Sequence, residues 1–141
     1  MSHAQFLIDT SALTRVLMNA SVQAEWAPQV DVGLIAICSI TEIELHYTAR
    51  SKAEIEEQAA LYREIFTWVV MHDDVFERAK EVQLLLAGRG SHRSAGPADL
   101  LLAATAEQHG LIILHYDADF AQVAEVTGQP ARWLAEPGSI D

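Results

Sequence analysis

The sequence predicts an α/β fold: a three-layer α/β/α sandwich built on a parallel sheet of about five strands. Short apolar runs without polar interruption are typical of strands that are buried on both faces of a parallel sheet. Such runs occur at Phe6–Ile8, Val32–Cys38, Trp68–Met71, Leu111–Leu114 and Ala131–Leu134. Segments with helical spacing separate them, and this alternation favours helices on both faces of the sheet. Right-handed crossovers then bring the carboxyl ends of the strands to one edge.

Helices are expected between and after these runs. They cover Ala12–Asn19, a short segment ending near Pro28, Thr41–Ala49, a segment from Ser51 to about Phe66, a segment from Asp73 or Asp74 to about Leu86, Ala98–His109, and a segment from Asp117 or Asp119 to Val126. Thr41 and Glu44 have the spacing of a capping box. Pro97 suits the first turn of a helix that Gly110 would end. The helix Ala98–His109 is apolar almost all round, which predicts a central position.

Length and composition favour one domain over residues 1–141, with a loose tail at its end. The longest apolar run is too short to span a bilayer, and the N-terminal residues lack the pattern of a signal peptide. The single cysteine, Cys38, lies in an apolar run and fits a reducing cytoplasm. A net charge of −11 disfavours loose binding to nucleic acid and suits a basic protein partner.

Five acidic residues follow predicted strands or begin predicted helices, and each has a structural explanation of its own. Asp9 can cap the next helix, and Glu44 can complete the capping box. Asp99, Asp117 and Asp119 can interact with the dipole at a helix start. However, parallel strands would bring all five acids toward one edge of the sheet. Clustered carboxylates repel one another unless a cation binds, so the sequence predicts a site for Mg²⁺ or Mn²⁺.

Other constellations in the sequence are weaker. The chain has no Walker lysine motif, dinucleotide-binding glycine motif, nucleophile elbow or paired-histidine zinc motif. His92 and Arg93 lie in a loop rich in glycine and serine, where they are candidates for substrate contact; a solvated loop without a role is an equal alternative. A phospho-acceptor domain of the receiver type would need a lysine near the acids. Lys52 and Lys80 lie within predicted helices away from the strand ends, so that class is disfavoured.

Four segments carry a resemblance to a known family. They are Ile8–Leu13 around the first acid, Glu44–Arg50, Arg93–Ala106 around Asp99, and Leu114–Phe120. In this order and spacing, the sequence resembles PIN-domain ribonucleases, specifically the VapC-type toxins of bacterial toxin–antitoxin pairs. The resemblance covers nearly the whole chain and implies a PIN-like α/β/α fold.

The resemblance also implies a metal-dependent endoribonuclease in which acids and Mg²⁺ or Mn²⁺ hydrolyse RNA phosphodiesters. By motif position, the catalytic acids are Asp9, Glu44, Asp99 and Asp117, the metal ligands are Asp9, Asp99 and Asp117, and the supporting residues are Asp119, Thr10 and Ser11. Thr10 or Ser11 would hold a water or a phosphate oxygen. Members of the family often have threonine or serine two residues before the fourth acid, where this sequence has His115.

The family also implies partners. Its members usually form homodimers, and a cognate antitoxin inhibits them, often by presenting an arginine to the acidic site. Two alternatives remain at this stage: a catalytically weak binding module with the PIN fold, and a DNA-directed nuclease of the same fold.

Overall fold

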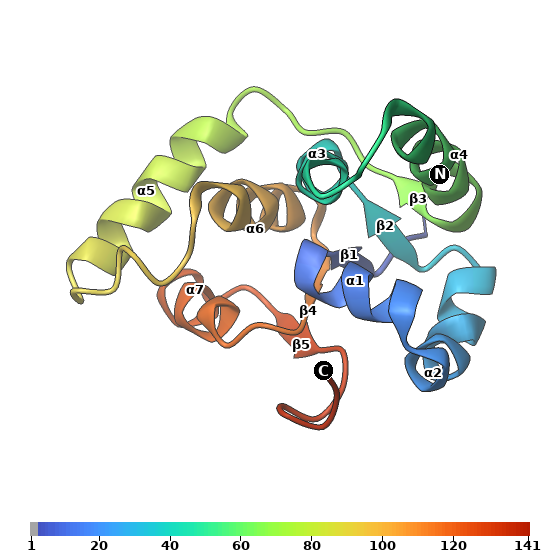
Figure 1. Cartoon of the computed structure of the whole chain (residues 1–141). Coiled ribbons are helices and arrows are strands. Elements are labelled where there is room, and N and C mark those ends of the chain that lie inside the picture. Colours follow the sequence, from blue (N-terminus) through green and yellow to red (C-terminus); the bar gives the residue numbers. More distant parts are fainter. Residues whose placement is uncertain (1–2) are drawn as a thin grey trace.

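The computed structural model describes residues 3–141, and its centre is a five-stranded, fully parallel sheet. The strands are β1 (Phe6–Ile8), β2 (Ile35–Ile37), β3 (Thr67–Trp68), β4 (Ile112–His115) and β5 (Ala131–Trp133). Their order in the sheet is β3-β2-β1-β4-β5, so the first strand is the central one (Figure 1). Every pairing is parallel, and Leu7 of β1 stands beside Ala36 on one side and Ile113 on the other. The predicted fold class is confirmed.

Helices cover both faces of this sheet. They are α1 (Thr10–Met18), α2 (Ala20–Asp31), α3 (Ser39–Tyr47), α4 (Lys52–Ile65), α5 (Val75–Ala87), α6 (Pro97–His109) and α7 (Asp119–Thr127). In the central strand, Leu7 packs into one apolar core with α5, α6 and α7. Its neighbours Phe6 and Ile8 pack into a second core with α1, α2 and α4, because side chains alternate across a strand. Over residues 3–141, no helix has the length and apolar character to cross a membrane.

Two boundaries around α2 differ from the prediction. The helix does not end near Pro28 but continues to Asp31. Pro28 and Ala24 both lie on the exposed side of α2, so water can bind the Ala24 carbonyl that proline leaves without an amide partner. The next strand begins at Ile35 and not at Val32, which is 67% exposed. Gly33 makes the intervening turn at φ 76°, a conformation that glycine adopts without strain.

The third strand is shorter and earlier than the predicted segment Trp68–Met71. It consists of Thr67 and Trp68 at the edge of the sheet. Val69 still donates its amide to the Ile37 carbonyl (3.1 Å), but Val70 is 52% exposed and has left the sheet. An edge strand is covered on fewer sides than a central one, so an apolar run there does not fix its boundaries.

The predicted capping box at Thr41 and Glu44 is wrong. Helix α3 begins at Ser39, with Cys38 in the N-cap position and no side chain capping it. Thr41 is fully buried, and its hydroxyl donates to the Ile8 carbonyl oxygen at the end of β1 (3.3 Å). The side chain of Glu44 is therefore free of the helix start and available to another partner.

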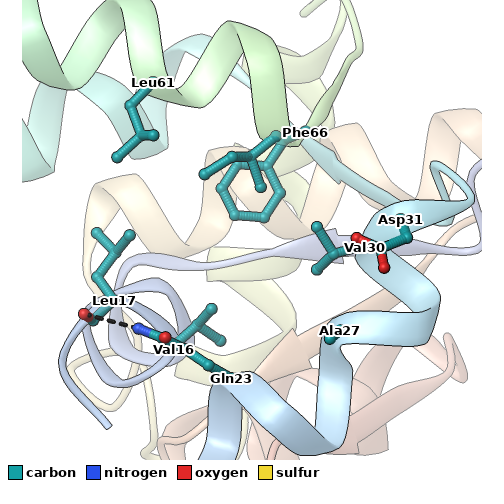
Figure 2. Close-up of a pocket in the computed structure, with 9 residues that line it drawn as sticks. Val16, Leu17, Gln23, Ala27, Val30, Asp31, Leu61 and Phe66 are labelled. Atoms are coloured by element: carbon teal, nitrogen blue, oxygen red, sulfur yellow. Dashed lines mark hydrogen bonds between the residues drawn. The ribbon is translucent and has the colours of Figure 1, made fainter. Parts of the chain in front are cut away.

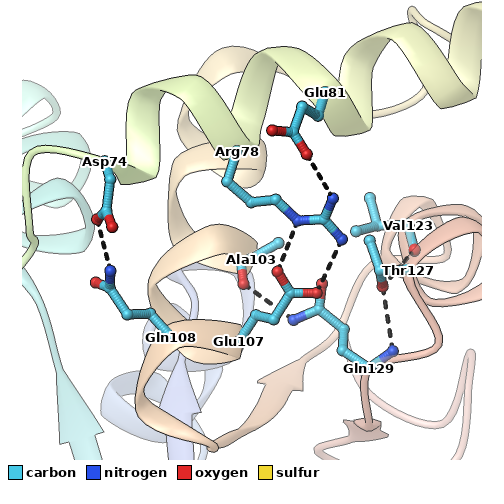
Figure 3. A network of polar contacts seen from close by, with 9 residues as sticks. All are labelled: Asp74, Arg78, Glu81, Ala103, Glu107, Gln108, Val123, Thr127 and Gln129. Atoms are coloured by element: carbon cyan, nitrogen blue, oxygen red, sulfur yellow. Dashed lines mark hydrogen bonds and ion pairs between the residues drawn. The ribbon is translucent and has the colours of Figure 1, made fainter.

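Polar contacts fix α6 against α5. Arg78 of α5 forms a two-pronged ion pair with Glu107 of α6, with Nε–Oε1 at 2.7 Å and Nη2–Oε2 at 3.1 Å (Figure 3). Gln108 donates from Nε2 to Oδ1 of Asp74 at 2.6 Å, just before α5 begins (Figure 3). These contacts add to the apolar packing of α6, which was predicted to be central. Its first turn, which carries Asp99, therefore has a defined position relative to the sheet.

The segment after β5 lies against Tyr116. The Tyr116 hydroxyl donates to the Ile140 carbonyl oxygen (3.1 Å) and accepts from the Ile140 amide (3.2 Å). The Ser139 hydroxyl bonds the Glu136 carbonyl oxygen at 2.6 Å, which closes a turn within this segment. The tail that was expected to be loose thus makes defined contacts with the loop after β4.

Candidate active site at the carboxyl edge of the sheet

Asp9 lies directly after the central strand, and its side chain is 4% exposed. It is the N-cap of α1, because its Oδ1 accepts the Ala12 amide at 2.9 Å. The Ser11 hydroxyl lies 2.7 Å from Oδ2 and 2.8 Å from Oδ1. Asp9 therefore has the capping role that its position suggested, and its carboxylate is held in one orientation at the edge of the sheet.

Glu44 reaches the same region from α3. Its Oε1 accepts a 2.6 Å hydrogen bond from the hydroxyl of Thr10, the residue after Asp9. Glu42, two residues earlier on the same helix, lies close enough to Tyr62 of α4 to act on it electrostatically. Burial and the charge of Glu42 together raise the pKa of Tyr62 to about 12. Of the two glutamates, Glu44 is the one that faces α1 and the strand end.

Asp99 lies in the first turn of α6, half-buried, with its Oδ2 accepting the Gly96 amide at 3.3 Å. Burial is the main cause that raises the pKa of Asp99 to about 6. Three neighbouring carboxylates contribute to the same rise: those of Glu44, Asp117 and Asp119. The charges of Glu44, Asp117 and Asp119 therefore act on the Asp99 carboxyl group, although the four acids come from three helices and a loop.

Burial also raises the pKa of Asp9 to about 6, and the charge of Asp99 adds to it. The hydrogen bonds from Ala12 and Ser11 act in the opposite direction and only partly offset the burial. Partial burial and the neighbouring Asp117 likewise raise the pKa of Asp119. Burial, more than the neighbouring charges, therefore disfavours the ionised form of these two acids.

Asp117 and Asp119 lie in the turn between β4 and α7. Oδ1 of Asp117 accepts the Asp119 amide at 2.9 Å, so Asp117 ends the turn and Asp119 begins the helix. The Asp117 amide points to Nδ1 of His115 at 3.2 Å. His115 is 2% exposed and packs between Phe120 and Trp133, with ring centroids 5.3 and 4.9 Å apart. Burial lowers the pKa of His115, so the neutral ring with Nδ1 as acceptor is the favoured form.

His115 thus faces the core and supports the backbone of Asp117, a role that sequence reasoning missed. A signal was present, because side chains two apart on a strand share a face. Ile113 lies in the core formed with α5, α6 and α7, and His115 follows it by two residues. His92 and Arg93 are exposed in the loop between α5 and α6, and their substrate contact stays a prediction.

A bound divalent cation would need donors of the kind that these acids carry. Within the described residues 3–141, no three acidic, histidine or cysteine side chains stand close enough to complete a metal site by themselves. The available donors are carboxylate oxygens, which Mg²⁺ and Mn²⁺ prefer, and Mg²⁺ usually keeps several waters beside one or two carboxylates. A cation here would also favour the charged forms of Asp9 and Asp99, whose pKa values are raised mainly by burial and further by neighbouring carboxylates. The chemistry of these donors therefore suits such an ion.

An apolar groove lies elsewhere, between α1, α2 and α4. It has a volume of about 340 Å³, and Figure 2 shows Leu17, Ala27, Val30 and Leu61 around it. None of the five candidate acids lines it. The groove is therefore separate from the acidic region, which remains the candidate for phosphodiester chemistry.

The chain is similar to proteins of a known family. The PIN domain family model matches residues 6–126. The chain belongs to the PIN-domain family. Among curated relatives, Ribonuclease VapC21 of Mycobacterium tuberculosis is 38% identical over 135 residues, covering 96% of this chain and 97% of the relative. Ribonuclease VapC51 of the same species is 39% identical over 137 residues, covering 97% and 98%. The resemblance to VapC-type proteins is thereby confirmed.

Solved structures show the same PIN fold at lower identity. The DNA-bound VapBC complex of Salmonella typhimurium contains a chain with a TM-score of 0.72 and 20% identity, covering 94% of this chain and 99% of that one. VapBC2 from Rickettsia felis, bound to a promoter DNA fragment, gives a TM-score of 0.74 at 16% identity, with 91% and 97% covered. At this identity the likeness shows the fold, and the chemistry has to be argued from the residues.

Proposed function

We propose that this chain, as a single PIN domain over residues 1–141, is a metal-dependent endoribonuclease and the toxin of a type II toxin–antitoxin pair. The observation that carries the proposal is the set of acids around Asp99. Hydrogen bonds connect three of these acids: the hydroxyl of Thr10, next to Asp9, bonds Glu44, and the Ser11 hydroxyl bonds both Asp9 and the amide of the residue before Asp117. The charges of Glu44 and Asp117 also act on Asp99. The relatives that are named VapC ribonucleases support the reaction class.

Asp9, Asp99 and Asp117 would hold Mg²⁺ or Mn²⁺ through their carboxylate oxygens. Such an ion, when bound, activates water and polarises a phosphoryl oxygen. Glu44 has one oxygen, Oε1, occupied by the Thr10 hydroxyl, which leaves Oε2 to accept a proton from the attacking water. The oxygen of water bonds to phosphorus as its proton passes to Glu44, and the bond between phosphorus and the 3′ oxygen breaks. The 3′ oxygen takes a proton from solvent, so the products carry a 5′-phosphate and a 3′-hydroxyl.

Three other residues would support a catalytic carboxylate or attract the RNA. Asp119 donates its amide to Asp117 and supports that carboxylate, and it is the alternative fourth acid. His92 and Arg93 would contact the phosphate backbone of RNA from the loop before α6. Because the chain has a net charge of −11, such local basic groups and the bound cation are needed to bring RNA to the acids.

We further propose a cognate antitoxin as the protein partner, homodimerisation, and a cytoplasmic location. The antitoxin is supported by the structural neighbours, which come from VapBC complexes, and by the acidic composition, which suits a basic partner. The location is supported by Cys38, which is buried and free, as is common for cysteine in a reducing compartment. Analytical ultracentrifugation of the chain, alone and with the protein encoded beside it, tests both assemblies.

The central test compares cleavage of RNA by the wild-type chain and by the Asp9→Asn and Asp99→Asn variants, each with Mg²⁺ or Mn²⁺. Both substitutions keep the shape of the side chain and remove its charge. We expect cleavage to fall at least about a hundredfold in each, since each removes a proposed metal ligand. Asp73→Asn, which changes an exposed aspartate outside the site, is the matched control and should cleave at the wild-type rate.

The same experiment separates the alternatives. Undiminished cleavage by both variants would exclude the two aspartates from the mechanism. Equal cleavage of a single-stranded DNA of the same sequence would favour a DNA-directed nuclease, and calorimetry without heat of Mn²⁺ binding would favour a catalytically weak binding module. We expect cleavage of the RNA alone and one or more bound Mn²⁺ ions.

A further inference from the structure

The hydroxyl of Ser11 connects two parts of the candidate site that are far apart in the sequence. It lies 2.7 and 2.8 Å from the two carboxylate oxygens of Asp9, to which it donates its hydrogen. It also accepts the backbone amide of Tyr116 at 2.9 Å, across a separation of 105 residues. A serine hydroxyl has only one hydrogen, and here a carboxylate takes it. Ser11 therefore has no hydrogen left to donate to a water or a phosphate oxygen.

The contact to Tyr116 extends to the fourth acid of the site. Tyr116 is followed by Asp117, whose amide bonds Nδ1 of the buried His115 at 3.2 Å. Oδ1 of Asp117 in turn accepts the Asp119 amide at 2.9 Å. The loop after β4 is thus held by Ser11 on one side and by His115 on the other.

A role in starting helix α1 does not explain the hydrogen bonds of the Ser11 hydroxyl. The start of α1 is already capped by Asp9, which accepts the Ala12 amide at 2.9 Å. The Ser11 hydroxyl bonds none of the unpaired amides at the start of α1. Instead it accepts the amide of Tyr116, directly after β4. Its two partners are Asp9, a candidate metal ligand, and Tyr116, which directly precedes the candidate ligand Asp117.

We propose that Ser11 is a positioning residue that holds the Asp9 carboxylate and the Asp117 loop in one arrangement for cation binding. The proposal rests on the proposed function of the same site. Groups that hold metal ligands from behind are typically worth ten- to a hundredfold in metal affinity or activity. Loss of the hydroxyl should therefore act on the affinity for the cation and on kcat, while KM for RNA stays the same.

The test uses Ser11→Ala, the conservative variant Ser11→Thr, and Thr14→Val as the matched control. Thr14 lies on the same helix, and its hydroxyl bonds only the Thr10 carbonyl oxygen, at 2.9 Å. We expect Ser11→Ala to weaken Mn²⁺ binding in calorimetry by about tenfold and to lower kcat by a similar factor. Ser11→Thr should restore both, and Thr14→Val should change neither.

A third measurement does not depend on activity: amide hydrogen exchange of the metal-free protein by NMR. In Ser11→Ala the amide of Tyr116 loses its acceptor and should exchange faster, while the central-strand amide of Leu7 keeps its protection. Faster exchange at both amides would mean general destabilisation and would overturn the proposal. So would wild-type affinity for Mn²⁺ in Ser11→Ala, or a failure of Ser11→Thr to restore it. If the wild-type chain cleaves no RNA, the proposed function is wrong. The amide exchange of Tyr116 and the affinity for Mn²⁺ still test whether Ser11 is a positioning residue.

Discussion

Replacement of Asp9 by asparagine is expected to stabilise the fold while it removes the activity. Asp9 is 4% exposed, and burial is the main cause that raises its pKa from 3.8 to about 6. The hydrogen bonds from Ala12 and Ser11 favour the charged form, but burial outweighs them. Asparagine has nearly the same shape, caps a helix as well as aspartate does, and has no charge to be desolvated.

The magnitude follows from the two pKa values of Asp9. A group whose pKa is raised by folding binds its proton more tightly in the folded state, so the folded state loses stability as pH rises from 3.8 to about 6. Below this window both states are protonated and no penalty exists; above it the penalty is complete. At about 1.4 kcal/mol for each tenfold change in proton affinity, the full penalty is at most about 3 kcal/mol.

Urea denaturation in the presence of a chelator measures the effect. We expect Asp9→Asn to raise the free energy of unfolding by up to about 3 kcal/mol at about pH 8 and by much less at about pH 4. Saturating Mn²⁺ should stabilise the wild type more than the variant, because a ligand stabilises the state that binds it. The reasoning is refuted if the variant is the less stable protein at about pH 8, or if the difference does not change with pH. Asp73→Asn, at an exposed aspartate, controls for loss of charge alone.

Three further substitutions test separate contacts. Thr10→Val removes the 2.6 Å hydrogen bond to Glu44 and should lower kcat by about tenfold. The free energy of unfolding should change by about 1 kcal/mol or less. An unchanged kcat would show that Glu44 does not need this hydrogen bond. Gly110→Ala places a side chain at φ 67°, so urea denaturation should show a loss of about 1 kcal/mol, and an equally stable variant would mean that the end of α6 relaxes. Arg78→Met breaks the ion pair with Glu107, in which both side chains are 32% exposed; a loss of about 1 kcal/mol that shrinks at high salt is expected, and a loss independent of salt would assign the effect to packing.

The sequence predicted those strand and helix boundaries that depend on a few adjacent residues. The apolar run Phe6–Ile8 and the polar stop at Asp9 located the central strand and its end, because a strand buried on both faces needs an unbroken apolar run. Gly110 likewise ended α6 at φ 67°, as its lack of a side chain indicated. In both cases the information lies within a few adjacent residues.

Contacts between distant segments could not be predicted in the same way. Thr41 and Glu44 have the spacing of a capping box, yet the Thr41 hydroxyl bonds the Ile8 carbonyl oxygen, 33 residues away, and Glu44 bonds Thr10, 34 residues away. The bond between Ser11 and the Tyr116 amide spans 105 residues. Each of these side chains also has a satisfactory local partner in principle, so its choice depends on how the strands and helices pack. The strands and helices that carry the acids were therefore predictable, but the hydrogen bonds that orient the acids were not.

Helix capping explains the positions of the acids but not their number or their pKa values. Asp9 caps α1, and Asp99 accepts the Gly96 amide at the start of α6, so each satisfies an amide that would otherwise be unpaired. At the N-cap of α1, which Asp9 occupies, asparagine or serine would serve equally well and without charge. Instead the pKa of each of these two aspartates is raised to about 6, and neighbouring carboxylates add to the burial that raises it. Burial of these charges costs stability near neutral pH, and a bound cation would offset that cost. The stabilisation expected of Asp9→Asn measures the cost of burying the Asp9 charge.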